Sequence, residues 1–191
     1  MMTALSLVFL NVFTNYLIAI AILLVCFGVI SYLINKGKDS LLFSEFEKLL
    51  SEKNISYNKV KNDNYNYIMN INDRNYYVRF MKVPTNSQVT INSKTTWCLQ
   101  FGGSRKGRSY PNKKYMNELS SFLRMKLPLD TDLKVIVLYP STERILRYLN
   151  ESEISEVFPI DTPNGYKVIS YDKLALKFND LLSTRKKKIG E

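Results

Sequence analysis

The longest hydrophobic pattern in the chain lies near its start, where residues 3–35 carry no charged side chain. Its densest part, residues 16–34 (YLIAIAILLVCFGVISYLI), is long enough to cross about 30 Å of hydrocarbon as a helix. A buried core helix is the simpler alternative, but a small domain rarely encloses so long an apolar run. A cleaved signal peptide is disfavoured because no Lys or Arg precedes the run and no small-residue cleavage site follows it. The pattern therefore predicts one permanent transmembrane anchor, residues 1–35.

The charges on either side of this run predict its orientation. Lys36 and Lys38 follow the run directly, whereas only the terminal amine precedes it. Short loops that carry Lys and Arg stay on the cytoplasmic side of a membrane. We therefore expect a single-pass membrane protein with its N-terminus outside. Residues 36–183 would form a cytoplasmic domain, and residues 184–191 a basic tail.

The next clear pattern, residues 65–101, predicts three consecutive β-strands. Residues 65–71 and 76–83 are rich in Tyr, Ile and Val, and the turn-forming residues 72–75 (NDRN) separate them, which predicts a hairpin. Pro84 ends the second strand because it removes a ladder donor. The third strand is either short, at residues 88–91, or longer, through residues 95–101. Three strands cannot bury a face alone, so other elements must cover them.

The remaining pattern predicts helices packed around a sheet. Helices are expected over residues 39–53, 111–127, 143–150 and 171–182, and further strands over residues 133–139 and 165–170. Residues 55–61 are either a first short strand or, because Asn and Lys are abundant around them, a loop. The helix at 111–127 would bury one face that includes Tyr115. The sequence thus predicts an α/β (α+β) fold: one domain with a central mixed sheet flanked by helices.

Composition excludes several kinds of chemistry. The chain has no histidine, which excludes Ser-His-Asp and Cys-His triads and histidine-containing zinc sites. Cys26 lies in the apolar run and leaves Cys98 as the domain's single cysteine, so the domain has no internal disulfide or cysteine-rich metal site. Without a histidine to activate it, Cys98 is predicted to pack in a strand rather than to act as a nucleophile. We expect no cofactor and no bound metal.

The net charge of +10 is concentrated in the middle of the domain. Residues 64–128 hold eleven Lys and Arg residues against two acidic residues, Asp73 and Glu118. Such a field attracts the phosphates of nucleic acid, or anionic lipid headgroups beside an anchor. The residues predicted to bind nucleic acid or another anion are Arg79, Lys82, Lys94, Arg105, Lys106, Arg108, Lys113 and Lys114.

Two short basic segments have weaker signals. Residues 102–109 (GGSRKGRS) form a flexible loop that matches neither GxxxxGK[ST] nor GxGxxG, so a nucleotide-binding loop is disfavoured. A solvated loop is the alternative interpretation. Residues 185–188 (RKKK) are expected to be disordered and to contact the inner leaflet or RNA.

The predicted elements of the domain follow the order helix, three strands, helix and strand. Four segments stand at particular positions within this order: residues 78–82 (VRFMK) in a strand, Trp97 in a later strand, Pro111-Asn112 at a helix start and residues 135–138 (VIVL) in the last strand. This order resembles the core of the PD-(D/E)xK nuclease superfamily. It is most similar to the nuclease-related domain found beside membrane segments in bacterial proteins. In that family a strand with an acid precedes a strand with Glu-x-Lys, and Lys82 matches that lysine. The resemblance covers about residues 42–139 and implies a restriction-endonuclease-like fold.

Two departures from the family remove the metal chemistry that the resemblance implies. Phe80 stands at the Glu of Glu-x-Lys, and Asn66 stands near the earlier acid. Phosphodiesterases of this kind hold Mg²⁺ with carboxylates, and neither a phenyl ring nor an amide supplies the negative charge. The resemblance therefore implies a pseudoenzyme that kept the scaffold and the basic surface, in which Lys82 contacts phosphate or solvent.

The aromatic residues of the strands leave two interpretations open. Tyr65, Tyr67, Tyr76, Tyr77 and Trp97 either pack in the core or stack nucleic-acid bases beside the cations of the second strand.

The function that best fits these observations is a membrane-anchored, non-catalytic binding domain for nucleic acid or an anionic protein or lipid surface. One alternative is a Mg²⁺-dependent nuclease whose acids are Asp63, Asp73 or Glu118. Another is a structural subunit of a membrane complex, in which Asn11, Thr14 and Asn15 contact other helices.

Overall fold

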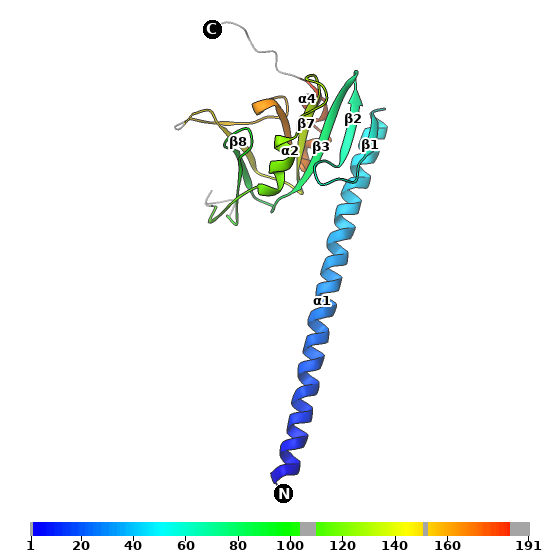
Figure 1. Ribbon diagram of the computed structural model, residues 1–191, viewed down its shortest axis with the longest axis vertical. Coiled ribbons are helices and arrows are strands. Elements are labelled where there is room, and N and C mark those ends of the chain that lie inside the picture. The colour runs from blue at the N-terminus through cyan, green and yellow to red at the C-terminus, as the bar shows by residue number, and fades with distance from the viewer. Residues whose placement is uncertain (1, 104–109, 151–152, 184–191) are drawn as a thin grey trace. The chain divides into compact units, whose positions relative to one another are not determined.

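The computed structural model describes residues 2–103, 110–150 and 153–183 of the chain (Figure 1). It contains two compact units, Met1–Glu52 and Lys53–Glu191. The fold is mixed α+β: the first unit is helical, and the second carries the strands. The basic tail, residues 184–191, and residues 104–109 of the predicted basic loop lie outside the described residues.

The first unit is a single continuous helix, α1 (Met2–Glu52). The sequence predicts that a second helix begins at residues 39–40, and this prediction is wrong because the backbone hydrogen bonds continue through that point. Residues 2–52 contain no proline, the residue that most often breaks a helix. The predicted apolar face is present, since Leu42, Phe46 and Leu50 are buried. The helix ends at Glu52, and Asn54 adopts a positive φ of 53°, which suits a residue just past a helix C-terminus.

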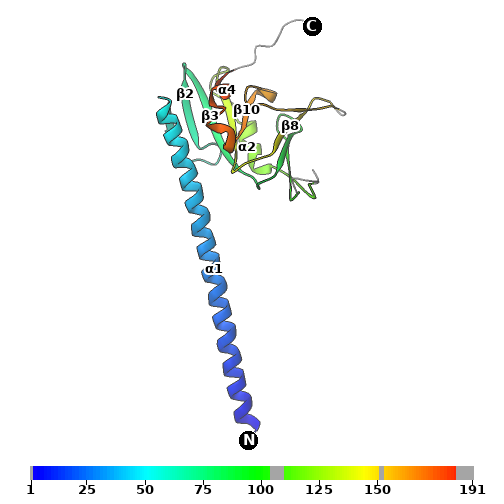
Figure 2. The same ribbon diagram turned by 180° about the vertical axis from the view of Figure 1, so that it is seen from behind.

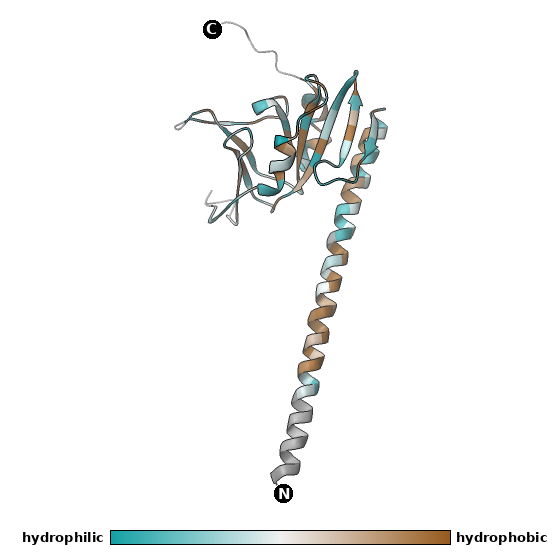
Figure 3. Cartoon of the chain, viewed as in Figure 1, coloured by the Kyte–Doolittle hydropathy of each residue, from teal (hydrophilic) through white to brown (hydrophobic). Residues whose placement is uncertain are grey.

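Part of α1 is long and apolar enough to cross a membrane. Its large apolar side chains between Tyr16 and Ile34 are exposed. Figure 3 colours most of the middle of α1 as hydrophobic. No other helix among the described residues meets this criterion of length and composition. An exposed apolar surface of this length needs a non-aqueous environment or a partner.

The first sheet of the second unit has five strands in the order β1-β2-β3-β7-β10. The strands are β1 (Ser56–Lys59), β2 (Tyr67–Ile71), β3 (Arg74–Lys82), β7 (Leu133–Tyr139) and β10 (Tyr166–Ser170). β2 runs antiparallel to both of its neighbours, β1 and β3, whereas β3, β7 and β10 are parallel. The strands predicted at residues 65–71, 76–83, 133–139 and 165–170 are confirmed, and of the two alternatives for residues 55–61 the strand is correct, as β1.

The β2–β3 hairpin illustrates how local chemistry fixes the register. Ile71 pairs with Arg74, so the loop contains two residues, Asn72 and Asp73, rather than the predicted four. Their φ angles are 52° and 60°. Two consecutive residues with positive φ are typical of the turn whose twist matches that of a hairpin, and Asn and Asp tolerate this conformation well.

The second sheet also has five strands, in the order β6-β5-β4-β8-β9. The strands are β4 (Gln88–Ile91), β5 (Trp97–Phe101), β6 (Asn112–Tyr115), β8 (Arg144–Tyr148) and β9 (Ile154–Glu156). β4 and β8 are parallel, and the other pairs are antiparallel. The single third strand predicted there is wrong: the segment forms two strands, β4 and β5, which pair as a hairpin, and the short alternative matches β4.

The expectation of one central sheet is wrong, because a parallel strand pair passes from one sheet into the other. β3 and β7 pair in the first sheet, and their continuations β4 and β8 pair in the second. Pro84, which cannot donate to a ladder, lies in the bend between β3 and β4. The Ser87 carbonyl accepts a hydrogen bond of 2.8 Å from the Glu143 amide at the same level. The strand pair thus bends without losing its partner.

Two predicted helices are strands. The first turns of the helix expected at 111–127 are β6, which pairs with β5 and leaves Tyr115 exposed. The helix expected at 143–150 is β8, held between β4 and β9. Pairing with a neighbouring strand outweighs local helix preference at both places. The helical part of the first segment is confined to η1 (Asn117–Leu119) and α2 (Ser120–Arg124).

The core of the second unit lies between the two sheets and α2. It includes Trp97, Phe122, Ile136, Tyr166 and Val168, all of them buried. The helix predicted over residues 171–182 is two short helices, α3 (Tyr171–Leu174) and α4 (Phe178–Leu182). Both pack beside β10, as Figure 2 shows for α4. A further turn, η2 (Pro163–Gly165), precedes β10.

Candidate anion-binding pocket

The five predicted anion-binding residues that the structure describes lie on three separate elements of the second unit. Lys113 and Lys114 are exposed on the edge strand β6, where Lys113 lies opposite Gln100. Lys94 is exposed in the turn between β4 and β5, at the other end of that hairpin. Arg105, Lys106 and Arg108 lie outside the described residues.

Two more predicted residues, Arg79 and Lys82, are on β3 of the first sheet. Arg79 is half-buried, and strand alternation places it on the same side of β3 as the core residues Tyr77 and Met81. Its Nε atom is buried and has no hydrogen-bond partner among the described residues. Lys82 is exposed at the end of the strand. Arg79 therefore belongs to the protein interior more than to a basic surface.

One of the predicted residues, Lys94, lines a hollow of about 610 Å³ together with three cations that the sequence prediction did not include. These are Arg124 at the end of α2, Lys126 just after it, and Lys134 on β7. We call this hollow the anion-binding pocket, and define it by Lys94, Arg124, Lys126 and Lys134. Arg124 and Lys126 were counted in the basic segment of the sequence. Lys134 was hidden in a strand that reads as wholly apolar.

Lys134 is the most unusual residue of the anion-binding pocket, because its side chain is only 5% exposed. Its Nζ atom donates hydrogen bonds to the carbonyl oxygens of Leu123, at 2.7 Å, and Met125, at 2.5 Å. It also lies 5.7 Å from the ring centre of Phe122 and 5.5 Å from that of Tyr166. Burial, and secondarily the charge of Lys94, lowers the pKa of Lys134 to about 8. An anion that entered the pocket would stabilise the charged form of Lys134 by supplying an opposite charge.

Tyr166 joins the two sides of the pocket. Its hydroxyl oxygen lies 2.8 Å from the carbonyl oxygen of Lys94 and 3.1 Å from that of Leu123, both of which can accept its proton. The ring packs edge-on against Trp97 with 6.2 Å between ring centres. Burial raises the pKa of Tyr166, so the hydroxyl keeps its proton as a donor at neutral pH.

The two carboxylates that line the pocket differ in their availability to the cations. Asp132 is buried, and its carboxylate accepts hydrogen bonds from the backbone amides of Asn75, at 3.2 Å, and Leu129, at 3.3 Å. Through these bonds the Asp132 carboxylate fixes the loop before β7. Asp130 lies on the exposed rim. Four cations against two carboxylates, one of them engaged by backbone, leave the pocket positively charged.

Aromatic side chains surround Phe80, which stands where the nuclease resemblance would place a metal-binding glutamate. Phe80 is 6% exposed, and its ring centre lies 6.1 Å from that of Tyr67, 6.2 Å from Tyr139 and 6.4 Å from Tyr171. The Asn66 side-chain oxygen accepts a hydrogen bond of 2.8 Å from the Phe80 amide. Asn66 and Phe80 are thus neighbours, as the resemblance requires of the two acid positions, but they form an apolar and amide-lined corner.

The strand aromatics are core residues. Tyr67, Tyr76, Tyr77 and Trp97 are buried, and half-buried Tyr65 packs edge-on against Tyr77 with 5.1 Å between ring centres. The interpretation that they stack nucleic-acid bases is therefore wrong for the four buried rings.

Cys98 packs in a strand, as predicted. It is buried on β5, and this burial raises the pKa of its thiol, an effect partly opposed by Lys113. Within residues 2–103, 110–150 and 153–183, no three His, Cys, Asp or Glu side chains come together in a way that could hold a metal ion.

Comparison with known proteins adds no relative: no family model, no curated protein and no solved structure matches this chain. Its function is therefore argued from its own geometry.

Proposed function

We propose that this protein is a membrane-anchored, non-catalytic binding protein that holds single-stranded nucleic acid through the anion-binding pocket. The observation that carries the proposal is the convergence of Lys94, Arg124, Lys126 and Lys134 on one hollow. These residues come from three separate segments of the chain. Cations that meet from distant segments are a stronger sign of a site than a run of adjacent basic residues, which is usually a solvated surface.

The chemistry of the pocket suits a single strand. Met125, Leu127 and Leu129 also line the hollow, so that its surface combines cations with apolar side chains. Proteins bind single strands without base-specific contacts by placing cations along the phosphates and apolar or aromatic groups against the bases. Exposed Arg124 and Lys126 would contact the phosphate backbone first, and the buried Lys134 would bind a phosphate that enters the pocket.

The membrane anchor and its orientation are part of the proposal. The exposed apolar stretch of α1 between Tyr16 and Ile34 supports a single membrane crossing. Lys36 and Lys38 after this stretch support a cytoplasmic second unit, where nucleic acid is accessible.

We also propose that the first sheet is a degenerate restriction-endonuclease-like core. The contact between Asn66 and Phe80 at the two expected acid positions supports this relationship. The elements α1, β1, β2, β3, α2 and β7 also occur in the expected order, although β4, β5 and β6 of the second sheet are inserted between β3 and α2. In this proposal the anion-binding function outlasted the metal site.

The proposal is tested by titrating the full-length protein, in nonionic detergent, into a fluorescently labelled single-stranded oligonucleotide and measuring anisotropy at several salt concentrations. We expect binding that weakens steeply with salt, because each neutralised phosphate releases a counterion. The double variant Arg124→Glu/Lys126→Glu should bind about a hundredfold more weakly at low salt. The matched control Lys113→Glu/Lys173→Glu makes the same total charge change on exposed residues outside the pocket, and should weaken binding only a few-fold.

Three outcomes would contradict the proposal. Equal weakening by both double variants would show diffuse attraction to the net charge rather than a site. Mg²⁺-dependent cleavage of the oligonucleotide would show an enzyme. Pocket-dependent binding to phosphatidylserine vesicles without oligonucleotide binding would identify an anionic lipid surface as the partner instead.

A further inference from the structure

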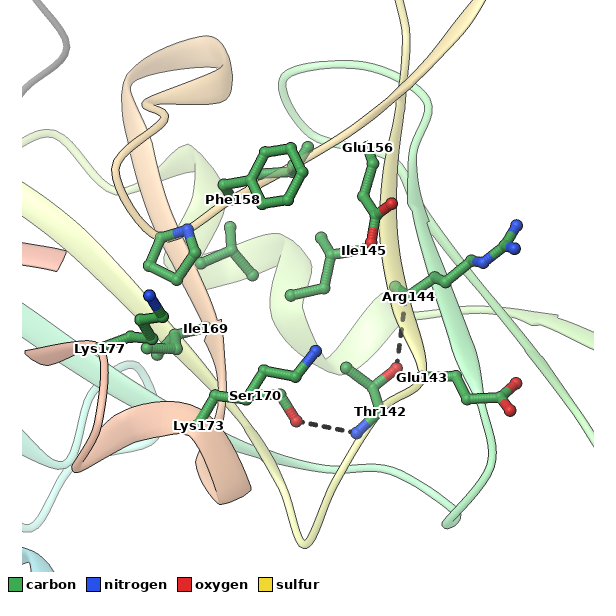
Figure 4. A pocket seen from close by; sticks show the side chains of 13 residues that line it. Thr142, Glu143, Arg144, Ile145, Glu156, Phe158, Ile169, Ser170, Lys173 and Lys177 are labelled. Carbon is green, nitrogen blue, oxygen red and sulfur yellow. Dashed lines mark hydrogen bonds between the residues drawn. The ribbon is translucent and has the colours of Figure 1, made fainter. Parts of the chain in front are cut away.

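A second pocket, of about 340 Å³, lies beside the carboxyl end of β10 and the β8–β9 hairpin (Figure 4). It shares no lining residue with the anion-binding pocket. Most of its wall is apolar and is formed by Ile145, Val157, Phe158, Pro159, Val168 and Ile169. We call it the Thr142–Ser170 pocket after the two polar residues at its base.

These two polar residues are committed to the protein. Ser170 and Thr142 are both buried, and the Ser170 hydroxyl oxygen accepts a hydrogen bond of 2.9 Å from the Thr142 amide. The Ser170 hydroxyl donates in turn to the Asp172 carboxylate, and the Thr142 hydroxyl donates to the Ser87 carbonyl at 2.7 Å. The base of the pocket is therefore already hydrogen-bonded. A ligand has to be recognised mainly by the apolar wall and by the charged side chains at the rim.

The charged rim is asymmetric. Figure 4 shows the Lys173 side chain reaching over Ser170 with its ammonium group directed into the hollow, whereas Arg144 and Glu143 are directed away from it. Lys177 lies to one side, and its ammonium is 3.4 Å from the Asp180 carboxylate. Glu156 lies on the opposite wall from Lys173 and Lys177. One cation thus faces the apolar interior, and a carboxylate across the pocket disfavours a second negative charge.

We propose that the Thr142–Ser170 pocket binds a small monocarboxylate with a compact apolar body, whose carboxylate pairs with Lys173. The volume is at the low end of the range for small-molecule sites, roughly 300–1,000 Å³, which suits one ring or a short branched chain. A mostly apolar wall with one convergent charge is the usual composition of such sites. A charge-assisted hydrogen bond at the edge of an apolar hollow supplies orientation that the wall alone does not. The proposal does not depend on nucleic-acid binding.

The test compares two ligands of the same shape, trans-cinnamate and trans-cinnamamide, by calorimetric titration of the full-length protein in nonionic detergent. We expect cinnamate to bind at roughly millimolar concentration or below, and the amide to bind about tenfold more weakly. The neutral amide enters micelles at least as readily as the anion, so detergent cannot produce a preference for cinnamate. Lys173→Met should weaken cinnamate binding about tenfold and leave amide binding unchanged. Lys113→Met, on β6, is the matched control and should change neither.

A second measurement locates the ligand. In protein with isotope-labelled isoleucine methyl groups, cinnamate should shift the resonances of Ile145 and Ile169, which line the pocket, before those of α1. Because Lys173 is exposed, Lys173→Met should unfold at the same denaturant concentration as the native protein. The fluorescence of Trp97 monitors this unfolding. Equal affinity for acid and amide, unchanged cinnamate binding by Lys173→Met, shifts confined to other residues, or no binding at millimolar concentration would each overturn the proposal.

Discussion

The Thr142 hydroxyl donates a hydrogen bond of 2.7 Å to the backbone carbonyl oxygen of Ser87. Ser87 precedes β4 and Thr142 precedes β8, so this bond lies where the parallel strand pair leaves the first sheet and enters the second. The Val83 amide, at the start of the same bend, donates to the Tyr139 carbonyl at 2.8 Å. Both residues of the first bond are fully or nearly fully buried. The two sheets are therefore joined by buried polar contacts as well as by the apolar core.

Thr142→Val should lower the free energy of unfolding by about 1–2 kcal/mol, because valine keeps the shape but removes one of the two donors, the other being the Glu143 amide, that bond the Ser87 carbonyl. Chemical denaturation followed by the fluorescence of Trp97, the single tryptophan of the chain, measures this change. Thr96→Val makes the same substitution at an exposed position and should change stability by less than about 0.5 kcal/mol. An equal effect of the two substitutions would show that the hydroxyl bond does not stabilise the bend.

The parts of the fold that the sequence predicts correctly are those specified locally. The β2–β3 hairpin follows from Asn72 and Asp73, which accept positive φ, and β7 follows from an unbroken apolar run. β6 and β8, in the second sheet, have mixed polar and apolar patterns. Pairing with neighbouring strands, rather than hydrophobic periodicity, determines that they are strands. The division into two sheets depends on the bend at Pro84, where the sequence indicates the end of a strand but not the passage of a strand pair into a second sheet.

The candidate site was predictable only in part, for a related reason. The concentration of positive charge in residues 64–128 includes Lys94, Arg124 and Lys126 of the anion-binding pocket. The sequence cannot show which of these cations meet, because the pocket joins segments from both sheets. Lys134 is the clearest omission. It interrupts an apolar strand. A charged residue at such a position indicates either a break in the strand or a buried charged group with hydrogen-bonding partners.

Binding of single-stranded nucleic acid should weaken as pH rises from about 7 to about 9. Burial and the charge of Lys94 lower the pKa of Lys134 to about 8, so its ammonium loses its proton within this range. The protonated form attracts phosphate and the neutral amine does not, so the affinity falls with rising pH. We expect a several-fold loss in anisotropy titrations at constant salt, since about nine tenths of this group is protonated at the lower pH and about one tenth at the upper.

Two variants separate Lys134 from other titrating groups. Lys134→Met should bind more weakly at neutral pH and show a flatter pH profile, whereas Lys113→Met should keep the native profile. A full pH dependence in Lys134→Met would assign the effect to another group. Because Lys134 also holds the Leu123 and Met125 carbonyls, the unfolding curve of Lys134→Met must first show that the variant is folded.

Phe80→Glu should destabilise the protein rather than create a metal site. The substitution restores the glutamate of Glu-x-Lys, but it places a carboxylate among the rings of Tyr67, Tyr139 and Tyr171. A buried charge without a partner costs about 3 kcal/mol or more, to be measured by denaturation as above. Phe80→Leu, the apolar control, should cost about 1–2 kcal/mol. If Mg²⁺ restores the stability of Phe80→Glu, this corner can hold a metal and the proposal of a lost site is wrong.

Lys167→Met should lower the free energy of unfolding by about 2 kcal/mol, because Lys167 is fully buried and its amine bonds three backbone carbonyls. Its Nζ atom donates to Ile160 at 2.9 Å, to Pro159 at 3.4 Å and to Ser183, and so fastens the chain on both sides of β10. Burial lowers the pKa of Lys167, but its ammonium has three N–H donors for the three carbonyls, whereas the neutral amine would have only two. Lys173→Met, the same substitution at an exposed site, should leave stability nearly unchanged. A Lys167→Met protein as stable as the native one would show that burying the ammonium costs as much as its three carbonyl contacts contribute.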